Sequence, residues 1–169
     1  MRRLVLVGAL LLTACGSPRA ALPPVVADGA VDHVLVEKAA HRMTLYVGDR
    51  AVRTYRVSLG AGGLGPKTRE GDRLTPEGEY PITGRNSRSR FHRALRIGYP
   101  TSAQLADAHA RGVSPGGDIM IHGLPNGAGV VPALFKGRDW TDGCIAVTDS
   151  EIDEIWRLVP DGAAVRIIA

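Results

Sequence analysis

The chain has 169 residues, enough for one domain with a hydrophobic core, and its hydrophobic and charged fractions of 44% and 22% are ordinary for a globular protein. Its 21 glycines and 11 prolines favour a fold rich in strands and turns over a helical bundle. The formal net charge of +4 includes Arg2 and Arg3, which lie in a segment with the features of an export signal. Without them the net charge is only +2, which gives no indication of nucleic-acid binding.

The first 15 residues have the order of features typical of bacterial export. Arg2 and Arg3 precede an apolar run at 4–12, which is too short to span a bilayer at about 1.5 Å per residue. The run leads into Leu-Thr-Ala-Cys at 12–15, which resembles the lipobox, the motif in which lipoproteins are cleaved before a cysteine that then carries lipid. We predict a signal peptide over residues 1–14 and a lipid anchor at Cys15, on an exported protein of the cell envelope that faces the periplasm. The alternative is a plain secretory signal with an incidental cysteine.

Composition and periodicity divide the rest of the chain. Residues 15–30 contain three prolines and many small residues, which predicts a flexible tether, and the domain is expected to occupy residues 31–169. Residues 60–78 are predicted to form a long loop, and residues 84–93 are polar and basic. Apolar alternation predicts strands and helical spacing predicts two helices, so the expected fold is mainly β with one or two short flanking helices. The predicted strands are 31–37, 42–47, 51–59, 79–83, 94–99, 118–122 and 164–168, and the predicted helices are 101–111, with Leu105 and Ala108 on one face, and 148–158.

Two short segments contain the candidate catalytic groups. An apolar strand ends in His122 and Gly123, and a turn with Gly143 precedes Cys144 and another apolar run. A nearby imidazole can take the thiol proton and hold it as an ion pair, while a backbone carbonyl near Gly123 can orient the ring. Glycine before the cysteine lets the backbone amides approach an oxyanion. The alternative is a core histidine and a buried thiol, and zinc is disfavoured because it needs three or four ligands.

The segments at 121–123 (IHG) and 141–147 (TDGCIAV) resemble the signature of the YkuD-type L,D-transpeptidase family, and the resemblance extends over residues 31–169. It implies a β-sandwich-like catalytic domain that needs no metal or organic cofactor. Within that domain, the resemblance makes Cys144 the nucleophile and His122 the proton donor and acceptor.

The residues around this cysteine differ from those of many family members. Trp140, Thr141 and Asp142 precede it and are candidates for substrate binding. Many members have histidine where this chain has Asp142, and arginine where it has Ala146. The loss of that arginine removes a fixed positive charge beside the thiol.

The family resemblance implies a two-step acyl transfer on peptidoglycan stem peptides. The thiolate would attack the carbonyl at the L-centre of the diamino acid in a tetrapeptide stem and release D-alanine. The thioester would then pass to an amine of another stem, to a lysine of a wall-linked protein, or to water. One alternative is a hydrolase on the same scaffold, an L,D-carboxypeptidase or amidase-type enzyme that trims stems or releases wall-linked protein. A second alternative is a non-catalytic wall-binding lipoprotein.

Five arginines fall in or beside the basic stretch, at positions 85, 88, 90, 93 and 96. The ordinary interpretation is a solvated loop with arginines that support the fold. The functional interpretation is that one or two of them bind stem carboxylates, for which a planar guanidinium group is well suited.

Overall fold

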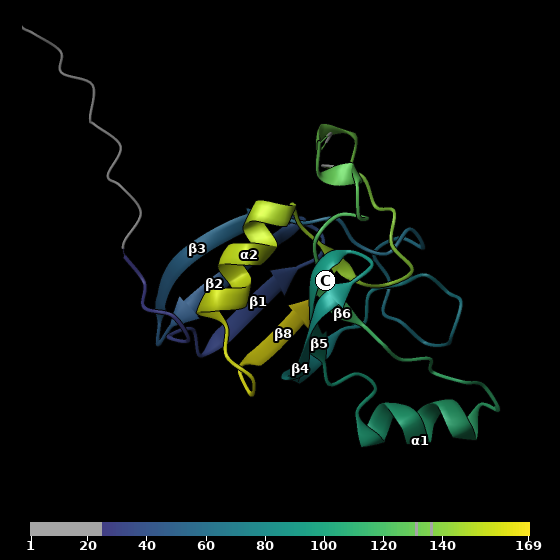
Figure 1. Cartoon of the computed structure of the whole chain (residues 1–169). Coiled ribbons are helices and arrows are strands. Elements are labelled where there is room, and N and C mark those ends of the chain that lie inside the picture. Colours follow the sequence, from purple (N-terminus) through teal and green to yellow (C-terminus); the bar gives the residue numbers. More distant parts are fainter. Residues whose placement is uncertain (1–24, 131, 136) are drawn as a thin grey trace, which may run out of the picture.

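The computed structural model describes residues 25–169 except 131 and 136, so the predicted signal peptide and Cys15 lie outside the described residues. Within that part, the chain forms eight strands, two α-helices and two short 3-10 helices (Figure 1). Neither α-helix there has the length and apolar character needed to cross a bilayer. The elements are β1 (His33–Glu37), β2 (Arg42–Val47), β3 (Arg50–Arg56), β4 (Gly78–Ser89), β5 (His92–Ile97), α1 (Ser102–Ala110), β6 (Met120–His122), η1 (Ala128–Val130), η2 (Pro132–Leu134), β7 (Ile145–Ala146), α2 (Asp149–Leu158) and β8 (Ala164–Ile168).

The strands form one mixed sheet in the order β3-β2-β1-β8-β4-β5-β6-β7. The first three strands make the antiparallel meander that their alternation indicates, and β8 returns to pair parallel with β1 and antiparallel with β4. The long strand β4 joins the two halves of the sheet. Residues 78–81 pair with β8, while residues 82–89 pair with β5 and shift register after Ile82. The prediction of a mainly β fold with two flanking helices is confirmed.

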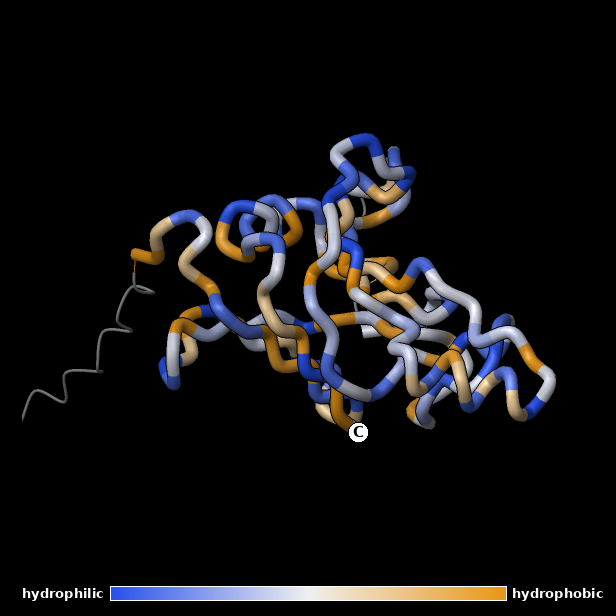
Figure 2. Tube along the Cα trace, turned by 90° about the horizontal axis from the view of Figure 1, so that it is seen from below, coloured by the Kyte–Doolittle hydropathy of each residue, from blue (hydrophilic) through white to orange (hydrophobic). Residues whose placement is uncertain are grey.

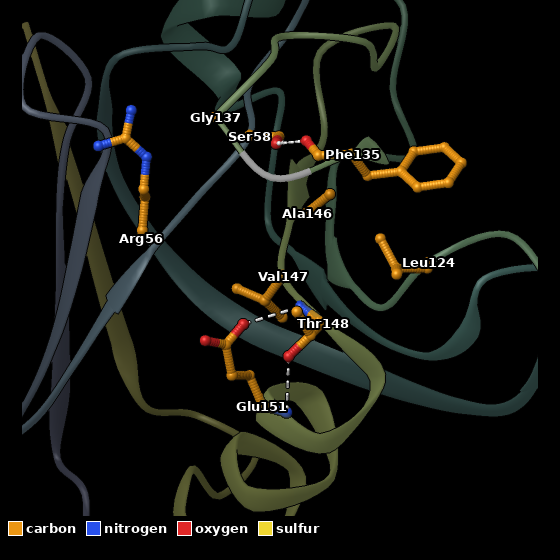
Figure 3. A pocket seen from close by; sticks show the side chains of 9 residues that line it. All are labelled: Arg56, Ser58, Leu124, Phe135, Gly137, Ala146, Val147, Thr148 and Glu151. Carbon is orange, nitrogen blue, oxygen red and sulfur yellow. Dashed lines mark hydrogen bonds between the residues drawn. The ribbon is translucent and has the colours of Figure 1, made fainter. Parts of the chain in front are cut away.

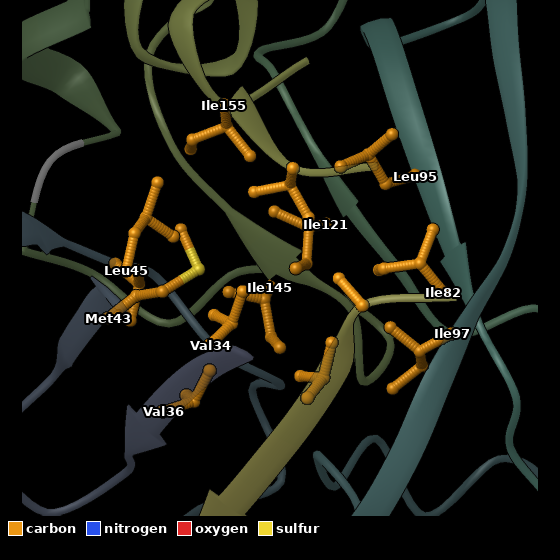
Figure 4. Packing of buried hydrophobic residues seen from close by; sticks show 14 of the residues in the cluster. Val34, Val36, Met43, Leu45, Ile82, Leu95, Ile97, Ile121, Ile145 and Ile155 are labelled. Carbon is orange, nitrogen blue, oxygen red and sulfur yellow. The ribbon is translucent and has the colours of Figure 1, made fainter. Parts of the chain in front are cut away.

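One hydrophobic core lies between the two halves of the sheet. Val34 and Met43 from the β1–β2 half meet Leu95 and Ile121 from the other half in a single cluster (Figure 4). Buried and more exposed residues alternate along β1 and β8, as expected when one face of a strand is buried, and Figure 2 shows hydrophobic and hydrophilic residues interspersed along the chain. Because β6 and β7 both contribute to this core, the segments that hold the candidate catalytic groups are fixed by packing.

Helix α2 closes one side of the core and is specified by local sequence. Its residues Ile152 and Ile155 are fully buried, and the helix packs against β5 and β6. Thr148 caps the helix, since its hydroxyl accepts from the Glu151 N–H and the Glu151 carboxylate accepts from the Thr148 N–H. Such a capping box stabilises a helix by about 1 kcal/mol. The predicted helix over residues 148–158 is confirmed.

One prediction about local structure needs correction. The polar stretch 84–93 is mostly strand, because Arg85 pairs with Leu95 and Asn86 with Ala94 in the β4–β5 hairpin. Backbone pairing therefore overrides the lack of apolar alternation. The predicted helix over 101–111 is confirmed as α1, in which Ala108 is buried and Leu105, one turn earlier on the same face, is 40% exposed.

Lys38 attaches the long loop at 60–78 to the sheet. This lysine is fully buried at the end of β1, and its Nζ donates to the carbonyls of Gly65 at 2.7 Å and Thr75 at 3.0 Å. It also forms an ion pair with Glu77 at 2.8 Å. Removing one partner of a buried ion pair typically costs about 3–5 kcal/mol, because the other charge is left uncompensated. The loop is thus held firmly against the domain.

Asp72 organises the middle of the same loop. Its carboxylate accepts hydrogen bonds from the Lys67 ammonium and from the backbone amides of Thr68, Arg69 and Leu74. Burial by itself raises the pKa of Asp72, but these donors outweigh burial and bring the pKa down to about 2. The carboxylate stays ionised and keeps the loop in place beside the Cys144 turn.

Candidate active site

Strands β6 and β7 bring the two candidate catalytic groups to one cleft. They pair in parallel, with Ile121 beside Ile145 and His122 beside Ala146, so Cys144, just before β7, lies at the start of β6, two residues along that strand from His122. The cleft has a volume of about 350 Å³, and we call it the Cys144 cleft. It is lined by Asn86, Arg88, Ser89, Arg90, Phe91, Ala94, Asp118, Met120, His122 and Cys144.

The turn that presents Cys144 requires glycine at position 143. Gly143 has a φ of 126°, and a Cβ there would lie 2.6 Å from the Leu74 carbonyl oxygen of the long loop. The buried Thr141 fixes the turn from inside, since its hydroxyl donates to the Cys144 carbonyl at 2.7 Å and accepts from the Gly143 N–H at 3.2 Å. Any larger residue at 143 would be strained and would push the loop away.

His122 is held in one tautomer within an aromatic environment. The imidazole is 2% exposed, and its Nδ1 lies 2.7 Å from the carbonyl oxygen of Gly123. A carbonyl only accepts, so Nδ1 carries the proton and Nε2 has the free lone pair. The rings of Phe91 and Trp140 have centroids 4.5 Å and 5.8 Å from the imidazole. Burial lowers the pKa of His122, although the Gly123 carbonyl partly offsets this, so the ring is neutral at neutral pH.

Cys144 rests as a thiol. Its Sγ lies 3.6 Å from the Asp118 carbonyl oxygen, to which only a protonated sulfur can donate. Burial raises the pKa of the thiol, the Met120 amide lowers it, and the charges of Asp142 and Asp118 raise it further. The thiolate–imidazolium pair expected from the sequence is therefore not the favoured resting state. Desolvation opposes both charges, so it favours a neutral thiol beside a neutral imidazole.

A first prediction concerns the pH dependence of alkylation. Cys144 should react slowly with iodoacetamide at neutral pH, and its rate should keep rising above the ordinary thiol pKa of about 8.5. The rate is measured by mass spectrometry of the peptide that contains Cys144. Asp142→Asn should move the midpoint to lower pH, because it removes a negative charge near the sulfur. A wild-type curve that reaches its plateau below the ordinary thiol value would contradict the neutral resting pair.

The three residues before the turn glycine have different positions. Trp140 packs against Phe91 and Phe135 behind the imidazole, and its indole N–H is buried without a partner among the described residues. Thr141 is 4% exposed, and its hydroxyl stabilises the turn by donating to the Cys144 carbonyl. Asp142 is exposed and forms an ion pair with Arg73 at 3.1 Å, while Trp140 is partly exposed. Direct substrate contact stays a proposal for Trp140 and Asp142, which both have exposed surface.

Sequence reasoning did not single out Phe91, the nearest ring to His122. Phe91 lies in the turn of the β4–β5 hairpin, and its carbonyl accepts from the Gly123 N–H at 3.1 Å. A lone aromatic residue in a basic stretch was the available signal, but the contact depends on how the hairpin folds over β6.

Ala146, which stands where many family members have arginine, lines a different and smaller cavity. That cavity also involves Arg56, Ser58 and Phe135, and the Ser58 hydroxyl donates to the Phe135 carbonyl at 3.0 Å (Figure 3). Ala146 is 2% exposed. Position 146 thus supplies no charge to the Cys144 cleft.

Within the described ranges, no three His, Cys, Asp or Glu side chains come together in a way that could hold a metal ion. The groups positioned for chemistry in the cleft are an uncharged sulfur nucleophile and an imidazole nitrogen with a free lone pair. Such a pair can perform acyl transfer by general-base-assisted attack of the sulfur.

Comparison with known proteins agrees with this description. YafK of Escherichia coli (strain K12), whose own name as an L,D-transpeptidase is provisional, is 29% identical over 177 residues. The match covers 94% of this chain but only 64% of YafK, so the chain spans less than two thirds of that relative. Among solved structures, the helical cell shape determining protein Pgp2 from Campylobacter jejuni is 25% identical with a TM-score of 0.62, over 84% of this chain and 50% of Pgp2.

A more distant structure supports the fold alone. The L,D-transpeptidase from Xylanimonas cellulosilytica is 17% identical with a TM-score of 0.54, over 86% of this chain and 63% of the other. The family model of the L,D-transpeptidase catalytic domain, YkuD, matches residues 31–167, which include both candidate catalytic groups and every described strand except the last residue of β8. On this match and this fold, the chain belongs to the YkuD family of L,D-transpeptidase catalytic domains.

Proposed function

We propose that this protein is a peptidoglycan L,D-transpeptidase with Cys144 as its nucleophile and His122 as its base. The observation that carries the proposal is that both groups line one cleft, with Nε2 of a neutral imidazole left free to accept a proton. The family membership supports the substrate class, which is the peptide stems of the bacterial cell wall.

In the first step His122 Nε2 takes the thiol proton as the sulfur attacks the carbonyl at the L-centre of the diamino acid. The backbone amides at Gly143 and Cys144 are the proposed donors to the oxyanion, and the Gly143 amide would turn from its 3.2 Å bond with Thr141. The intermediate collapses to a thioester, and the leaving amine of D-alanine takes the proton from the imidazolium. A neutral resting pair suits this step, because the base must begin unprotonated.

In the second step an amine attacks the thioester. His122 takes a proton from the amine, the new amide bond forms, and the sulfur leaves and recovers a proton. The acceptor is an amine of a second stem or a lysine of a wall-linked protein, and water in its place would make the enzyme a hydrolase.

The name of Pgp2 assigns that protein to cell shape, and the proposal extends such a role to this chain. An unchanged cell outline in a deletion strain would remove the shape role alone.

The direct test is intact-mass analysis of the protein after incubation with a purified tetrapeptide stem, with and without an amine acceptor. We expect a thioester adduct at Cys144 and, with the acceptor, a cross-linked product that has lost D-alanine. Trimmed stems alone, even with excess acceptor, would favour the hydrolase. The absence of any adduct or product would favour a wall-binding protein.

We also propose that residues 1–14 are a signal peptide and that Cys15 carries lipid, with residues 15–30 linking the anchor to the domain. The described part of this link meets the domain beside α2, where Gly29 N–H donates to the Arg157 carbonyl at 2.8 Å. Cys15→Ser should move the protein from the membrane to the soluble fraction, measured by fractionation and by acyl mass. Cys144→Ser serves as the control and should leave partitioning unchanged. A wild-type protein without acyl mass would contradict the anchor but not the catalytic proposal.

A further inference from the structure

The structure divides the five clustered arginines into two groups. Three of them are neutralised by acidic partners, and two of these three also lie over the ring of Trp156. These three support the fold or balance a neighbouring charge. The pairs are Arg85 with Asp161 at 2.8 Å, Arg93 with Asp153 at 3.3 Å and Arg96 with Asp118 at 2.5 Å.

Arg88 and Arg90 form the second group. Both are exposed near the turn of the β4–β5 hairpin, and both line the Cys144 cleft. Neither has a carboxylate within ion-pair distance in the part of the chain that the structure describes. The guanidinium of Arg90 lies 6.0 Å from the ring of Phe91.

The cleft therefore has an excess of positive charge. Asp118 is its acidic lining residue, and Arg96 already neutralises that carboxylate. Two unpaired guanidinium groups face the cleft that contains the nucleophile, and a concave wall of one sign concentrates ligands of the opposite sign. Guanidinium is also the side-chain group best suited to grip a carboxylate through two hydrogen bonds.

We propose that Arg88 and Arg90 bind a carboxylate of the donor stem peptide and so place its scissile carbonyl at Cys144. This inference rests on the proposed function. In the tetrapeptide stem that function requires, the residues next to the attacked carbonyl carry free carboxylates, on the D-centre of the diamino acid and on the terminal D-alanine. The hairpin wall then supplies a positive charge that position 146 lacks in this chain.

The position of the pair also connects binding to the base. Arg90 is adjacent to Phe91, whose ring covers the imidazole of His122 at 4.5 Å. A carboxylate held by Arg90 would keep the hairpin turn, and therefore Phe91, over the imidazole. Substrate recognition and exclusion of water from the base are then performed by the same turn.

The first arm of the test does not depend on stem chemistry. Iodoacetate and iodoacetamide alkylate the same sulfur and differ in charge. The ratio of their rates at Cys144 does not depend on the fraction of thiolate, so it reports the electrostatic potential at the sulfur. We expect the double variant Arg88→Gln and Arg90→Gln to lower the iodoacetate-to-iodoacetamide ratio about three- to tenfold, with the difference shrinking at high salt.

The matched control removes the same formal charge elsewhere. Arg50, at the start of β3, and Arg166, on β8, are exposed, and neither lines the cleft. The double variant Arg50→Gln and Arg166→Gln should keep the wild-type ratio. An unchanged ratio in the Arg88 and Arg90 variant, or an equal fall in the control, would overturn the proposal.

The second arm uses tetrapeptide stems in which each carboxylate is amidated in turn. The Arg88 and Arg90 variant should lose about 10- to 100-fold in kcat/KM, mainly through KM, on the free stem. One amidated stem should be equally poor for wild type and variant, which identifies the bound carboxylate. Equal losses on every stem would overturn the assignment. The wild-type protein could also react faster with iodoacetate than with iodoacetamide and still form no acyl-enzyme with any stem. That result would contradict both the proposed function and the stem carboxylate as the ligand of the two arginines.

Discussion

Replacement of Cys144 by alanine is expected to abolish acyl transfer, with a loss of at least about 10⁴-fold, because the thioester cannot form without the sulfur. The fold should survive, since Sγ makes only weak polar contacts, with the Asp118 carbonyl at 3.6 Å and with the Met120 amide, and its replacement by a hydrogen atom removes little packing. The measurement is the appearance of cross-linked stem and of acyl-enzyme, together with the thermal unfolding curve of the same sample.

The second cysteine of the chain provides the control for this result. Cys15→Ser also removes one thiol, but it lies outside the described domain and should leave the rate of purified protein unchanged. Cys144→Ser keeps a weaker nucleophile in the same turn and should retain at most a trace of activity. A folded Cys144→Ala protein that still joins stems would exclude the mechanism proposed above.

Loss of the base should be nearly as severe. His122→Ala is expected to lower kcat by about 10²–10⁴, because it removes the Nε2 lone pair that is proposed to accept the thiol proton. The variant leaves a space lined by Phe91 and Trp140, so added imidazole should restore part of the rate. His109→Ala, at the exposed end of α1, is the matched control and should have wild-type activity.

The pH profile separates a catalytic role of His122 from a structural one. Burial lowers the pKa of His122, and a base acts only when unprotonated. Wild-type kcat/KM should therefore persist as pH falls through the ordinary histidine pKa of about 6.5 and decline only below it. This decline at low pH, the acid limb of the profile, should be absent from His122→Ala. An acid limb above the ordinary value, or one that the variant retains, would show that another group controls the rate.

Much of the fold and the two candidate catalytic positions followed from local pattern. The last strand, 164–168, and the helix that Thr148 caps were predicted within one residue, because alternation and capping involve only neighbours in sequence. The segments around His122 and Cys144 predicted the family, which the family match confirms. Such features depend on neighbouring residues alone, so they can be recognised without the tertiary structure.

Tertiary structure decided what depends on residues far apart in sequence. The 84–93 stretch became a hairpin because β5 pairs with it, and only that hairpin brings Phe91 onto His122. Burial from several elements made the thiol and the imidazole neutral, where adjacency alone suggested an ion pair. Partners from α2 and from the segments before β6 and β8 neutralised three arginines and left Arg88 and Arg90 for the cleft. Sequence fixes which charges exist, but desolvation and pairing, which depend on the folded surroundings, determine which of them remain available to a substrate.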